Sequence, residues 1–420
     1  MRNKVLFKVV ALTVLILGIM ITIGIRYGRA VNAAPGTIVV SPGPGAIQDA
    51  INAASPGDII EVTNGTYYEN LIVNKSVSII GQDPSNTVID GGGKPIAVDI
   101  LSSDVVVSGF TIENGTGELP PYVGLGSGIS IYRCNSTTIK NNVLRNNYYG
   151  LQLANASNCM IFNNIIMNSS YSGIFIRVDS NDSVFFQNTI ENNAIGLYTY
   201  CPSNTFYHNN FINNTRQCSA APPVTLDNDA IKEGNYWSDY EGSNMNLTGI
   251  GDSPFVEEVF TDGYPLMGMF TNFTIAYKGE SYFLSTICNS TISNFEFNAS
   301  SESIGFNVIG LNRTQGFCRI AIPLTLIQNR CTILVNDIKV SGKSTSAWNS
   351  STYGYRSFVY NNTGVASRVT VELGPVGGGT SPSFLVPVVI AVSLVVILLV
   401  LMTLIRGNLG KKIKCSKKQS

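Results

Sequence analysis

The sequence predicts an all-β protein in which a parallel β-helix, or solenoid, is followed by a small β-sandwich-like domain and a C-terminal transmembrane helix. Three observations support this fold class. Residues 128–214 repeat with a period of 22 to 23 residues, residues 270–373 alternate apolar and polar residues between polar turns, and residues 384–405 form an apolar run without a charged residue. These patterns are typical of a solenoid, of antiparallel strands and of a membrane span, respectively.

The repeat is the strongest of these signals. Each unit begins with a glycine and a short strand, followed by a polar turn, a second apolar pair, a pair of amide residues and a third apolar pair, as in "GLQLANASNCMIFNNIIMNSSYS". Strands this short bury a face only when successive units stack as coils. The repeat predicts equivalent glycines (Gly128, Gly150, Gly173, Gly196), two inward ladders (Ile129/Leu151/Ile174/Leu197 and Ile139/Ile161/Phe185/Tyr207) and stacked turn ladders at the amide pairs (Asn141-Asn142, Asn163-Asn164, Gln187-Asn188, Asn209-Asn210).

Both ends of a solenoid need a cover, because the first and last coils expose their apolar interior. A short amphipathic helix over residues 46–54 would cover the first coil. At the other end, "GNYWSDYEG" follows the last unit without resembling it. We expect Trp237 and Tyr240 to cover the last coil, and Asp239 to fix the loop by accepting hydrogen bonds from backbone amides.

The cap phrase, the coils and the series "GNYWSDYEG", "GIGDSPF" and "DGYPL" together resemble the NosD-like, pectin-lyase-type right-handed parallel β-helix proteins. The resemblance extends from Pro35 to about Met269 and implies a right-handed solenoid over residues 34–269. It also places the chain near a wider group of surface carbohydrate-binding proteins and sugar hydrolases, while NosD itself is linked to copper-site maturation. Residues 270–373 resemble an accessory domain that often follows such helices on archaeal surface proteins. Because the coils serve many functions, the resemblance implies a fold more than an activity.

The two chain ends predict a membrane-anchored surface protein. Residues 1–33 contain an apolar run after Lys4 and Lys8, as in a signal peptide or a signal anchor. Residues 374–383 form a Gly/Pro/Ser linker, residues 384–405 the transmembrane helix, and residues 406–420 a basic tail. Because basic residues favour the inner side of a membrane, the tail is predicted to be cytoplasmic and the bulk of the chain extracellular.

Composition and cysteine content bear on partners and compartment. Lys+Arg and Asp+Glu number 27 each, so no basic field exists to hold a nucleic acid. Seven cysteines precede the predicted membrane helix, and in an oxidising compartment Cys318–Cys331 and Cys201–Cys218 are the first pairs to consider. Fifteen Asn-x-Ser/Thr motifs between the two apolar segments predict N-glycosylation, at Asn64, Asn74, Asn114, Asn135, Asn155, Asn168, Asn181, Asn213, Asn246, Asn272, Asn289, Asn298, Asn312, Asn349 and Asn361.

Acidic residues supply an enzyme hypothesis. Arg177, Asp179 and Asp182 lie one coil before Glu191, and paired carboxylates about 5–9 Å apart catalyse acid–base hydrolysis of glycosides. The alternative is a solvated turn. The chain has no Asp-Asp pair and a single histidine, His208, which the repeat places outside the solenoid as a ligand contact or an ordinary surface residue. One histidine and dispersed methionines give no support to a copper role.

Two further sets of residues are candidates for binding. Exposed aromatic rings near the ends of coils suit a sugar chain, with ordinary packing as the alternative; they are Tyr148, Tyr149, Tyr171, Tyr198 and Tyr200. The resemblance also implies a calcium loop after the tryptophan motif, with Asp239, Asn244, Asn246 and Asp252 as oxygen ligands. Asparagines at two of these positions lower the expected affinity, and no other cofactor is expected.

These observations favour a membrane-anchored extracellular protein that recognises polysaccharide or cell-envelope glycan without catalysis. An alternative is a polysaccharide lyase, hydrolase or epimerase on the same fold that uses Asp179, Asp182 and Glu191. Another is a structural surface spacer or adhesin, in which the repeats act as a rigid rod.

Overall fold

The computed structural model describes residues 34–116, 126–327, 331–342 and 345–373, all within one compact unit that ends at Gly374. The predicted signal segment, linker, transmembrane helix and basic tail lie outside these residues. Among the residues that are described, no helix has the length and apolar character needed to cross a membrane.

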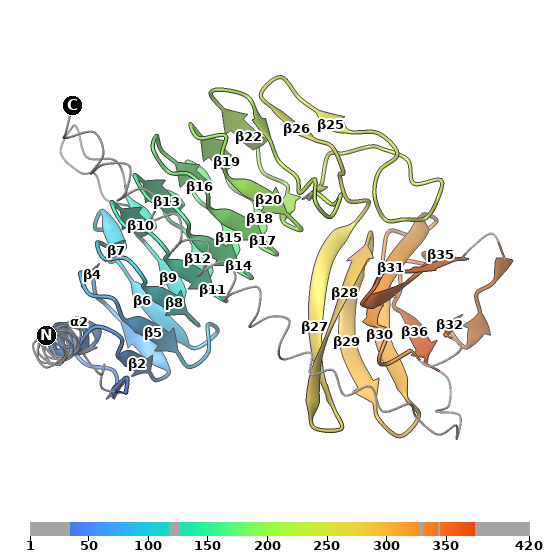
Figure 1. Ribbon diagram of the computed structural model, residues 1–420, viewed down its shortest axis with the longest axis horizontal. Coiled ribbons are helices and arrows are strands. Elements are labelled where there is room, and N and C mark those ends of the chain that lie inside the picture. The colour runs from blue at the N-terminus through green and yellow to red at the C-terminus, as the bar shows by residue number, and fades with distance from the viewer. Residues whose placement is uncertain (1–33, 117–125, 328–330, 343–344, 374–420) are drawn as a thin grey trace, which may run out of the picture. The chain divides into compact units, whose positions relative to one another are not determined.

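Three parallel sheets form the β-helix, and each complete coil contributes one short strand to each sheet (Figure 1). The first sheet contains β1 (Thr37–Val40), β2 (Ile59–Val62), β5 (Ser78–Gly81), β8 (Val106–Ser108), β11 (Thr138–Lys140), β14 (Met160–Phe162), β17 (Val184–Phe186) and β20 (Thr205–Tyr207). The second contains β3 (Gly65–Tyr67), β6 (Thr87–Asp90), β9 (Thr111–Glu113), β12 (Val143–Arg145), β15 (Ile165–Met167), β18 (Thr189–Glu191), β21 (Asn210–Ile212) and β24 (Tyr236–Trp237). The third contains β4 (Leu71–Val73), β7 (Ile96–Ile100), β10 (Ser127–Tyr132), β13 (Tyr149–Ala154), β16 (Ser172–Ile176), β19 (Ile195–Thr199) and β22 (Arg216–Ala220).

The inward ladders fill the space between the sheets. The predicted ladder Ile129/Leu151/Ile174/Leu197 is confirmed, with each residue in register with the next and fully buried. The second predicted ladder is wrong at its last member. Phe206 pairs with Phe185 and is buried, whereas Tyr207 pairs with Phe186 and points outward, because the coils are 21 rather than 22 residues apart at this point.

A buried asparagine ladder fixes the turn between the first and second sheets. The Nδ2 of each asparagine donates to the Oδ1 of the asparagine one coil later at 2.9–3.2 Å, through Asn142, Asn164, Asn188, Asn209 and Asn235. The residue before each of the first four has a φ of 54–58° (Asn141, Asn163, Gln187, His208), a left-handed conformation that asparagine tolerates well. The equivalent pair in the last repeat is therefore His208-Asn209, and the predicted pair Asn209-Asn210 is wrong by one residue.

Close packing of the coils also explains the repeated glycine. A Cβ added to Gly150 would lie 2.5 Å from Ile166 and 2.6 Å from the carbonyl oxygen of Gly173 in the next coil. The start of β13 in the third sheet thus has no room for a side chain at this position.

A helix covers the first coil, as expected. The helix α2 (Ala46–Ala53) buries Ile47, Ala50 and Ile51 against the interior of the solenoid. Its first-turn amides at Ile47 and Gln48 donate to the carboxylate of Glu69 at 3.1 and 3.0 Å. A carboxylate is stabilised at a helix N-terminus by the unpaired amides and the helix dipole.

Trp237 closes the opposite end. It is 1% exposed, and its ring stacks on Phe211 with 4.3 Å between centroids and on Phe260 at 4.7 Å. Its indole Nε1 donates to Asp262 Oδ2 at 2.8 Å. Tyr240 packs half-buried beside it, with its ring 5.5 Å from that of Phe255.

The carboxylate that fixes this cap is Asp262, and the expected role of Asp239 is wrong. Asp239 accepts from the side-chain amide of Gln217 at 3.0 Å, whereas Asp262 accepts from the backbone amides of Asn235 and Tyr264 at 2.8 and 2.9 Å. Burial raises the pKa of the Asp262 carboxyl to about 6, against the opposing effect of its hydrogen bonds. Asp262 belongs to a small sheet of β23 (Val224–Thr225), β26 (Phe260–Asp262) and β25 (Phe255–Val256).

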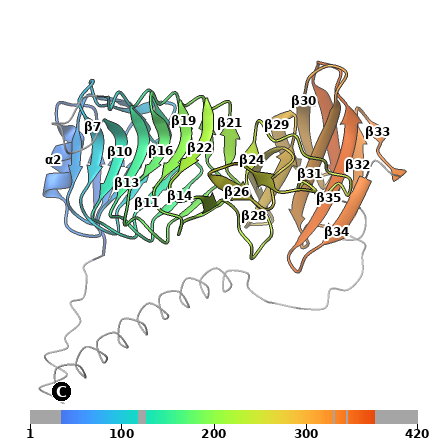
Figure 2. The same ribbon diagram turned by 90° about the horizontal axis from the view of Figure 1, so that it is seen from above.

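Two five-stranded antiparallel sheets follow and enclose one apolar core, so they form a β-sandwich (Figure 2). One sheet contains β27 (Met269–Tyr277), β28 (Glu280–Cys288), β31 (Gln315–Pro323), β35 (Tyr353–Asn361) and β34 (Thr345–Asn349). The other contains β29 (Thr291–Asn298), β30 (Ser303–Ile309), β36 (Ser367–Glu372), β32 (Thr332–Val335) and β33 (Ile338–Lys339). The sandwich starts with β27, within one residue of the predicted boundary.

Neither expected cysteine pair is joined. All seven cysteines of the described residues are free thiols. Cys201 Sγ contacts the carbonyl oxygen of Arg177 at 3.2 Å, and Cys218 continues the inward ladder after Leu197. Cys318 instead lies directly opposite Cys288 on the neighbouring strand.

We expect Cys288 and Cys318 to form a disulfide when the chain folds in an oxidising medium. The amide of Asn289 donates to the carbonyl of Phe317, so Cys288 and Cys318 form a pair without mutual backbone hydrogen bonds. Such pairs have Cα atoms about 4.5 Å apart, within the range of disulfides. After folding with oxidised and reduced glutathione, alkylation in denaturant without reductant should label Cys331 and spare Cys288 and Cys318. Full labelling of Cys288 would contradict the prediction.

Candidate functional site

The acidic candidates for catalysis do not converge. Asp179 and Asp182 are exposed in the turn between β16 and β17, with left-handed φ values of 61° and 57°. Glu191 is the last residue of β18 in the second sheet, beyond the strand of the first sheet that separates it from this turn. Arg177 begins the same turn as the two aspartates and lies half-buried. The structure thus supports the interpretation that Asp179 and Asp182 belong to a solvated turn. It does not place either of them beside Glu191 as an acid–base pair.

His208 is not an ordinary surface residue. Its ring stacks on Phe270 at the start of the sandwich, with 4.0 Å between centroids, and its Nε2 lies 2.5 Å from Glu233 Oε2. The other oxygen of Glu233 accepts from Arg319 Nη1 at 2.8 Å. We call His208, Glu233 and Arg319 the ion triad, since it joins the last coil and its cap to β31 of the sandwich.

Arg319 of the ion triad is buried, the side chains of His208 and Glu233 are each 13% exposed, and the charges of Arg319 and Glu233 compensate one another. Arg319 is 3% exposed and also donates to the carbonyl of Thr248 at 3.0 Å. Burial alone would raise the pKa of the Glu233 carboxyl, but the Arg319 charge and the His208 contact outweigh it and lower that pKa to about 2. Glu233 is therefore ionised at every physiological pH and serves as the fixed counter-ion of Arg319.

The five tyrosines predicted to bind sugar lie together on the outer side of the third sheet. We call them, with Phe175, the tyrosine strip. Tyr149 stacks on Phe175 at 4.7 Å and Phe175 on Tyr198 at 5.2 Å, while Tyr148 stacks on Tyr171 at 5.3 Å. The expectation that all five are exposed holds only for Tyr200; Tyr148, Tyr171 and Tyr198 are half-buried, and Tyr149 is 7% exposed beneath its neighbours.

Stacking along the strip determines what it offers a ligand. Because ring faces of successive coils cover one another, a ligand meets ring edges, the open ring of Tyr200 and the hydroxyl groups. The hydroxyls of Tyr198 and Tyr200 lie 2.5 Å apart. This hydrogen bond, with partial burial, raises the pKa of Tyr198 to about 12, so the hydroxyl is neutral and able to donate.

Two of the predicted calcium ligands, Asn244 and Asp252, are engaged within their own loop. Asp252 Oδ2 accepts from the Ser243 hydroxyl at 2.8 Å and from the Met245 amide at 2.9 Å, and Asn244 Oδ1 accepts from the Gly249 amide at 3.2 Å. Asp239 accepts a hydrogen bond from Gln217, and Asn246 lies between Asn244 and Asp252 in sequence. In the described part of the chain no three His, Cys, Asp or Glu side chains gather as metal ligands. Calcium binding by these residues stays a prediction.

A cleft not predicted from the sequence lies between the first sheet and the sandwich. One wall is a column of outward rings, in which Phe162 stacks on Phe186 at 4.8 Å and Phe186 on Tyr207 at 5.5 Å. The other wall comes from β28 and β35, and the ion triad borders the space. We call this space of about 440 Å³ the aromatic cleft; its opposite wall contains Phe283, Tyr353 and Tyr355.

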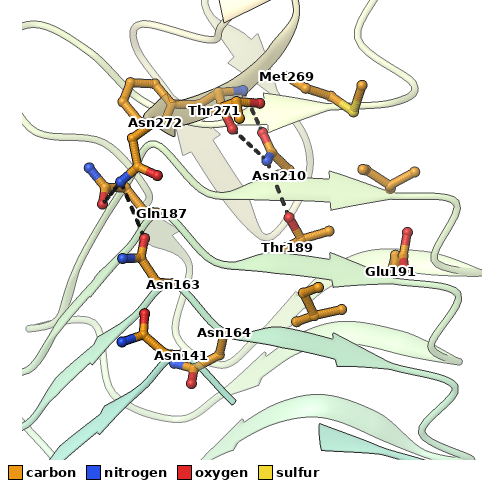
Figure 3. A pocket seen from close by; sticks show the side chains of 13 residues that line it. Asn141, Asn163, Asn164, Gln187, Thr189, Glu191, Asn210, Met269, Thr271 and Asn272 are labelled. Atoms are coloured by element: carbon orange, nitrogen blue, oxygen red, sulfur yellow. Dashed lines mark hydrogen bonds between the residues drawn. The ribbon is translucent and has the colours of Figure 1, made fainter. Parts of the chain in front are cut away.

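A second pocket, of about 480 Å³, adjoins it on the side of the second sheet (Figure 3). Its edge is formed by the left-handed turn residues Asn141, Asn163 and Gln187 of three successive coils. Asn272 of β27 reaches across and donates to Gln187 Oε1 at 2.6 Å and to Asn163 Oδ1 at 3.4 Å. This amide bridge lines both spaces and separates them.

The aromatic cleft was missed for an identifiable reason. The recurring aromatic residue at positions 162, 186 and 207 is a usable signal for an outward column, but a constant period of 22 residues places Tyr207 in the interior. The opposite wall comes from strands more than 70 residues later in the chain, and no repeat relates them to the coils.

Comparisons with known proteins agree with the solenoid. Residues 121–242, less than a third of the chain, match the family model described as periplasmic copper-binding protein (NosD). None of the curated proteins matches the chain at a significant level.

Solved structures with a similar backbone fold include three from bacteria and their viruses. YbhC of Escherichia coli is 14% identical, with 50% of this chain and 72% of that chain covered and a TM-score of 0.35. ORF18 of Geobacillus virus E2 is also 14% identical, with 68% and 74% covered and a TM-score of 0.35. The tailspike gp49 of the Acinetobacter baumannii bacteriophage Fri1, a capsular polysaccharide depolymerase, is 10% identical, with 82% and 85% covered and a TM-score of 0.31.

The family match and the three stacked parallel sheets lead to the same assignment. The chain contains a parallel β-helix, and residues 121–242 of it are similar to the family described as periplasmic copper-binding protein (NosD).

Proposed function

We propose that this protein recognises polysaccharide or cell-envelope glycan without catalysing a reaction, through the tyrosine strip. The observation that supports this most directly is the gathering of five tyrosines on one side of one sheet, across the coils of β13, β16 and β19. The function rests on the site, because the β-helix scaffold hosts many activities.

The chemistry of the strip suits a sugar chain. Tyrosine combines an apolar ring with a hydroxyl that both donates and accepts hydrogen bonds. A sugar presents apolar C–H groups and hydroxyls in the same small area. The rigid, mutually stacked rings lose little conformational freedom on binding, which favours recognition by tyrosine.

No observation favours the enzyme alternative. The carboxylates of Asp179 and Asp182 lie in an exposed turn, and Glu191 lies in another sheet. Anchoring of the protein in a membrane, with the β-helix outside, also belongs to this proposal and rests on the apolar segments at the chain ends.

A glycan array probed with the purified full-length chain tests the proposal. Replacing Tyr198 by alanine opens the stack and removes the hydroxyl pair with Tyr200, and should weaken glycan binding about tenfold or more, as for other central tyrosines of binding surfaces. The matched control is Tyr132→Ala, a 41% exposed tyrosine of the same sheet outside the strip, which should bind as wild type. Release of shortened products from a bound glycan would overturn the non-catalytic part. Equal binding by both variants would overturn the role of the strip.

A further inference from the structure

We propose that the aromatic cleft is a second glycan-binding site, and that it takes an uncharged segment of a sugar chain. This inference rests on the proposed function for the class of ligand. It concerns different residues, on the first sheet and the sandwich, and it selects between neutral and acidic polysaccharides.

The walls are apolar and aromatic on both sides. The column of Phe162, Phe186 and Tyr207 faces strands of the sandwich that contribute Tyr353, Tyr355 and Phe283. Phe283 is 62% exposed although it borders a concave space, so a large apolar surface is open to a ligand. Sites for small ligands combine such apolar walls with a few placed polar groups.

Amide groups supply the polar contacts at one edge. Asn272 Nδ2, which this contact requires to be unglycosylated, donates to Gln187 Oε1. In the hydrogen bonds of the described residues, Asn272 Oδ1 and Gln187 Nε2 take no part. An acceptor and a donor thus remain side by side at the edge of the cleft, an arrangement that matches the hydroxyl groups of a sugar.

The charges in the lining argue for a neutral ligand. The lining contains one arginine and one glutamate, Arg319 and Glu233, which are paired at 2.8 Å, and the single histidine contacts the same glutamate. No unpaired cation is therefore available among the described lining residues. Lys140 lies one coil before Phe162, with its Nζ 5.9 Å from the centre of that ring, but it is not part of the cleft lining. A uronate or sulfate group bound within the lining would therefore lose its hydration and gain no counter-ion there, which is costly.

The cleft is held open by fixed contacts between the β-helix and the sandwich. Asn210 of the last coil donates to the carbonyl of Phe270 at 2.9 Å and accepts from the Phe270 amide at 2.7 Å, in a buried setting. The ion triad joins the same two parts. Because both walls are positioned before a ligand arrives, binding does not have to order them.

Calorimetric titration of the full-length chain with hexasaccharides tests this inference. The neutral probes are cellohexaose, mannohexaose and chitohexaose, and the acidic probes are hexagalacturonate and hexaguluronate. We expect the wild-type chain to bind at least one neutral hexasaccharide, and Phe283→Ala to bind it about tenfold more weakly. Any binding of the acidic hexasaccharides should be the same in Phe283→Ala and in the wild type. Leu311→Ala, an 80% exposed apolar residue of the sandwich outside the cleft, is the control and should bind as wild type.

The outcomes separate this inference from the proposed function. If Tyr198→Ala abolishes all binding while Phe283→Ala has no effect, the tyrosine strip stands and the cleft is overturned. Binding of an acidic probe that Phe283→Ala weakens overturns the neutral preference. If the wild-type chain binds no glycan on the array or in titration, both proposals fail.

Discussion

Replacing Trp237 by alanine is expected to lower the free energy of unfolding by about 3–5 kcal/mol, the range for a fully buried aromatic residue. The ring lies between Phe211 of the last complete coil and Phe260 of the small sheet, so its loss opens a cavity at the end of the solenoid. It also leaves the buried carboxylate of Asp262 without its indole donor. Urea unfolding of the full-length chain followed by far-ultraviolet circular dichroism measures the loss.

Trp348 provides a matched control, because it is the other tryptophan of the chain. It is half-buried on the strand β34 and stacks on Tyr355 with 5.1 Å between centroids. Trp348→Ala should cost clearly less than Trp237→Ala, since less of its surface leaves water on folding. Equal stability of Trp237→Ala and wild type would show that the solenoid does not depend on this cap.

Replacing Glu233 by glutamine is expected to lower the free energy of unfolding at pH 7 by about 3–5 kcal/mol, because it leaves Arg319 buried without a counter-ion. Arg319 is 3% exposed and contacts both the cap and the sandwich, so it cannot regain its hydration while the structure stays intact. Glutamine retains the size of glutamate, which makes the charge the main difference between the two proteins.

The pH dependence gives this prediction a second measurement. The folded-state pKa of Glu233 is lowered to about 2, below the ordinary glutamate value of 4.5. Between these values the unfolded chain binds more protons than the folded one, so the stabilisation is complete above about pH 4.5 and is lost as the pH falls toward 2. The difference between wild type and Glu233→Gln should therefore shrink between pH 4.5 and pH 2.

The control for Glu233 is an ion pair of similar length on the surface. Glu113 and Arg145 lie 2.6 Å apart in adjacent coils, with the arginine side chain 44% exposed. Exposed pairs contribute about 0–1 kcal/mol, so Glu113→Gln should be close to wild type at pH 7. A similarly small loss of unfolding free energy in Glu233→Gln would mean that Arg319 finds another partner. The ion triad would then not stabilise the contact between the β-helix and the sandwich.

Much of the solenoid could be predicted from the sequence because its information is local and repeated. The glycine of each coil and the ladder from Ile129 to Leu197 follow directly from the period. The error at Tyr207 arose because one coil is shorter, and a shift of one residue exchanges the inner and outer faces of a strand. The predicted register counts each repeat from its glycine, whereas in the structure the buried asparagine is the residue that aligns one coil with the next.

The candidate sites were less predictable, since they depend on contacts between distant segments. Sequence patterns gathered the tyrosines of the strip, but they did not show that the rings stack on one another and bury Tyr149. Nothing near His208 indicates its contact with Glu233 or the proximity of Arg319, 86 residues beyond Glu233. The hydrogen-bond partner of Trp237 is Asp262, the aspartate of the motif "DGYPL" that contributes to the family resemblance. The buried hydrogen bond between the two side chains explains why the two motifs occur together.

The asparagine ladder has a consequence for how such a chain can change its length. Successive ladder asparagines are separated by 22, 24, 21 and 26 residues, yet each meets the next with the same hydrogen bond. The turn between the first and second sheets therefore keeps the same geometry in every coil, and differences in coil length are accommodated in the other turns. A segment running from one ladder asparagine to the next is in effect a removable module. Deleting one, from Asn164 through Gln187, would bring Asn142 and Asn188 together and shorten the solenoid by one coil while keeping both of its covers.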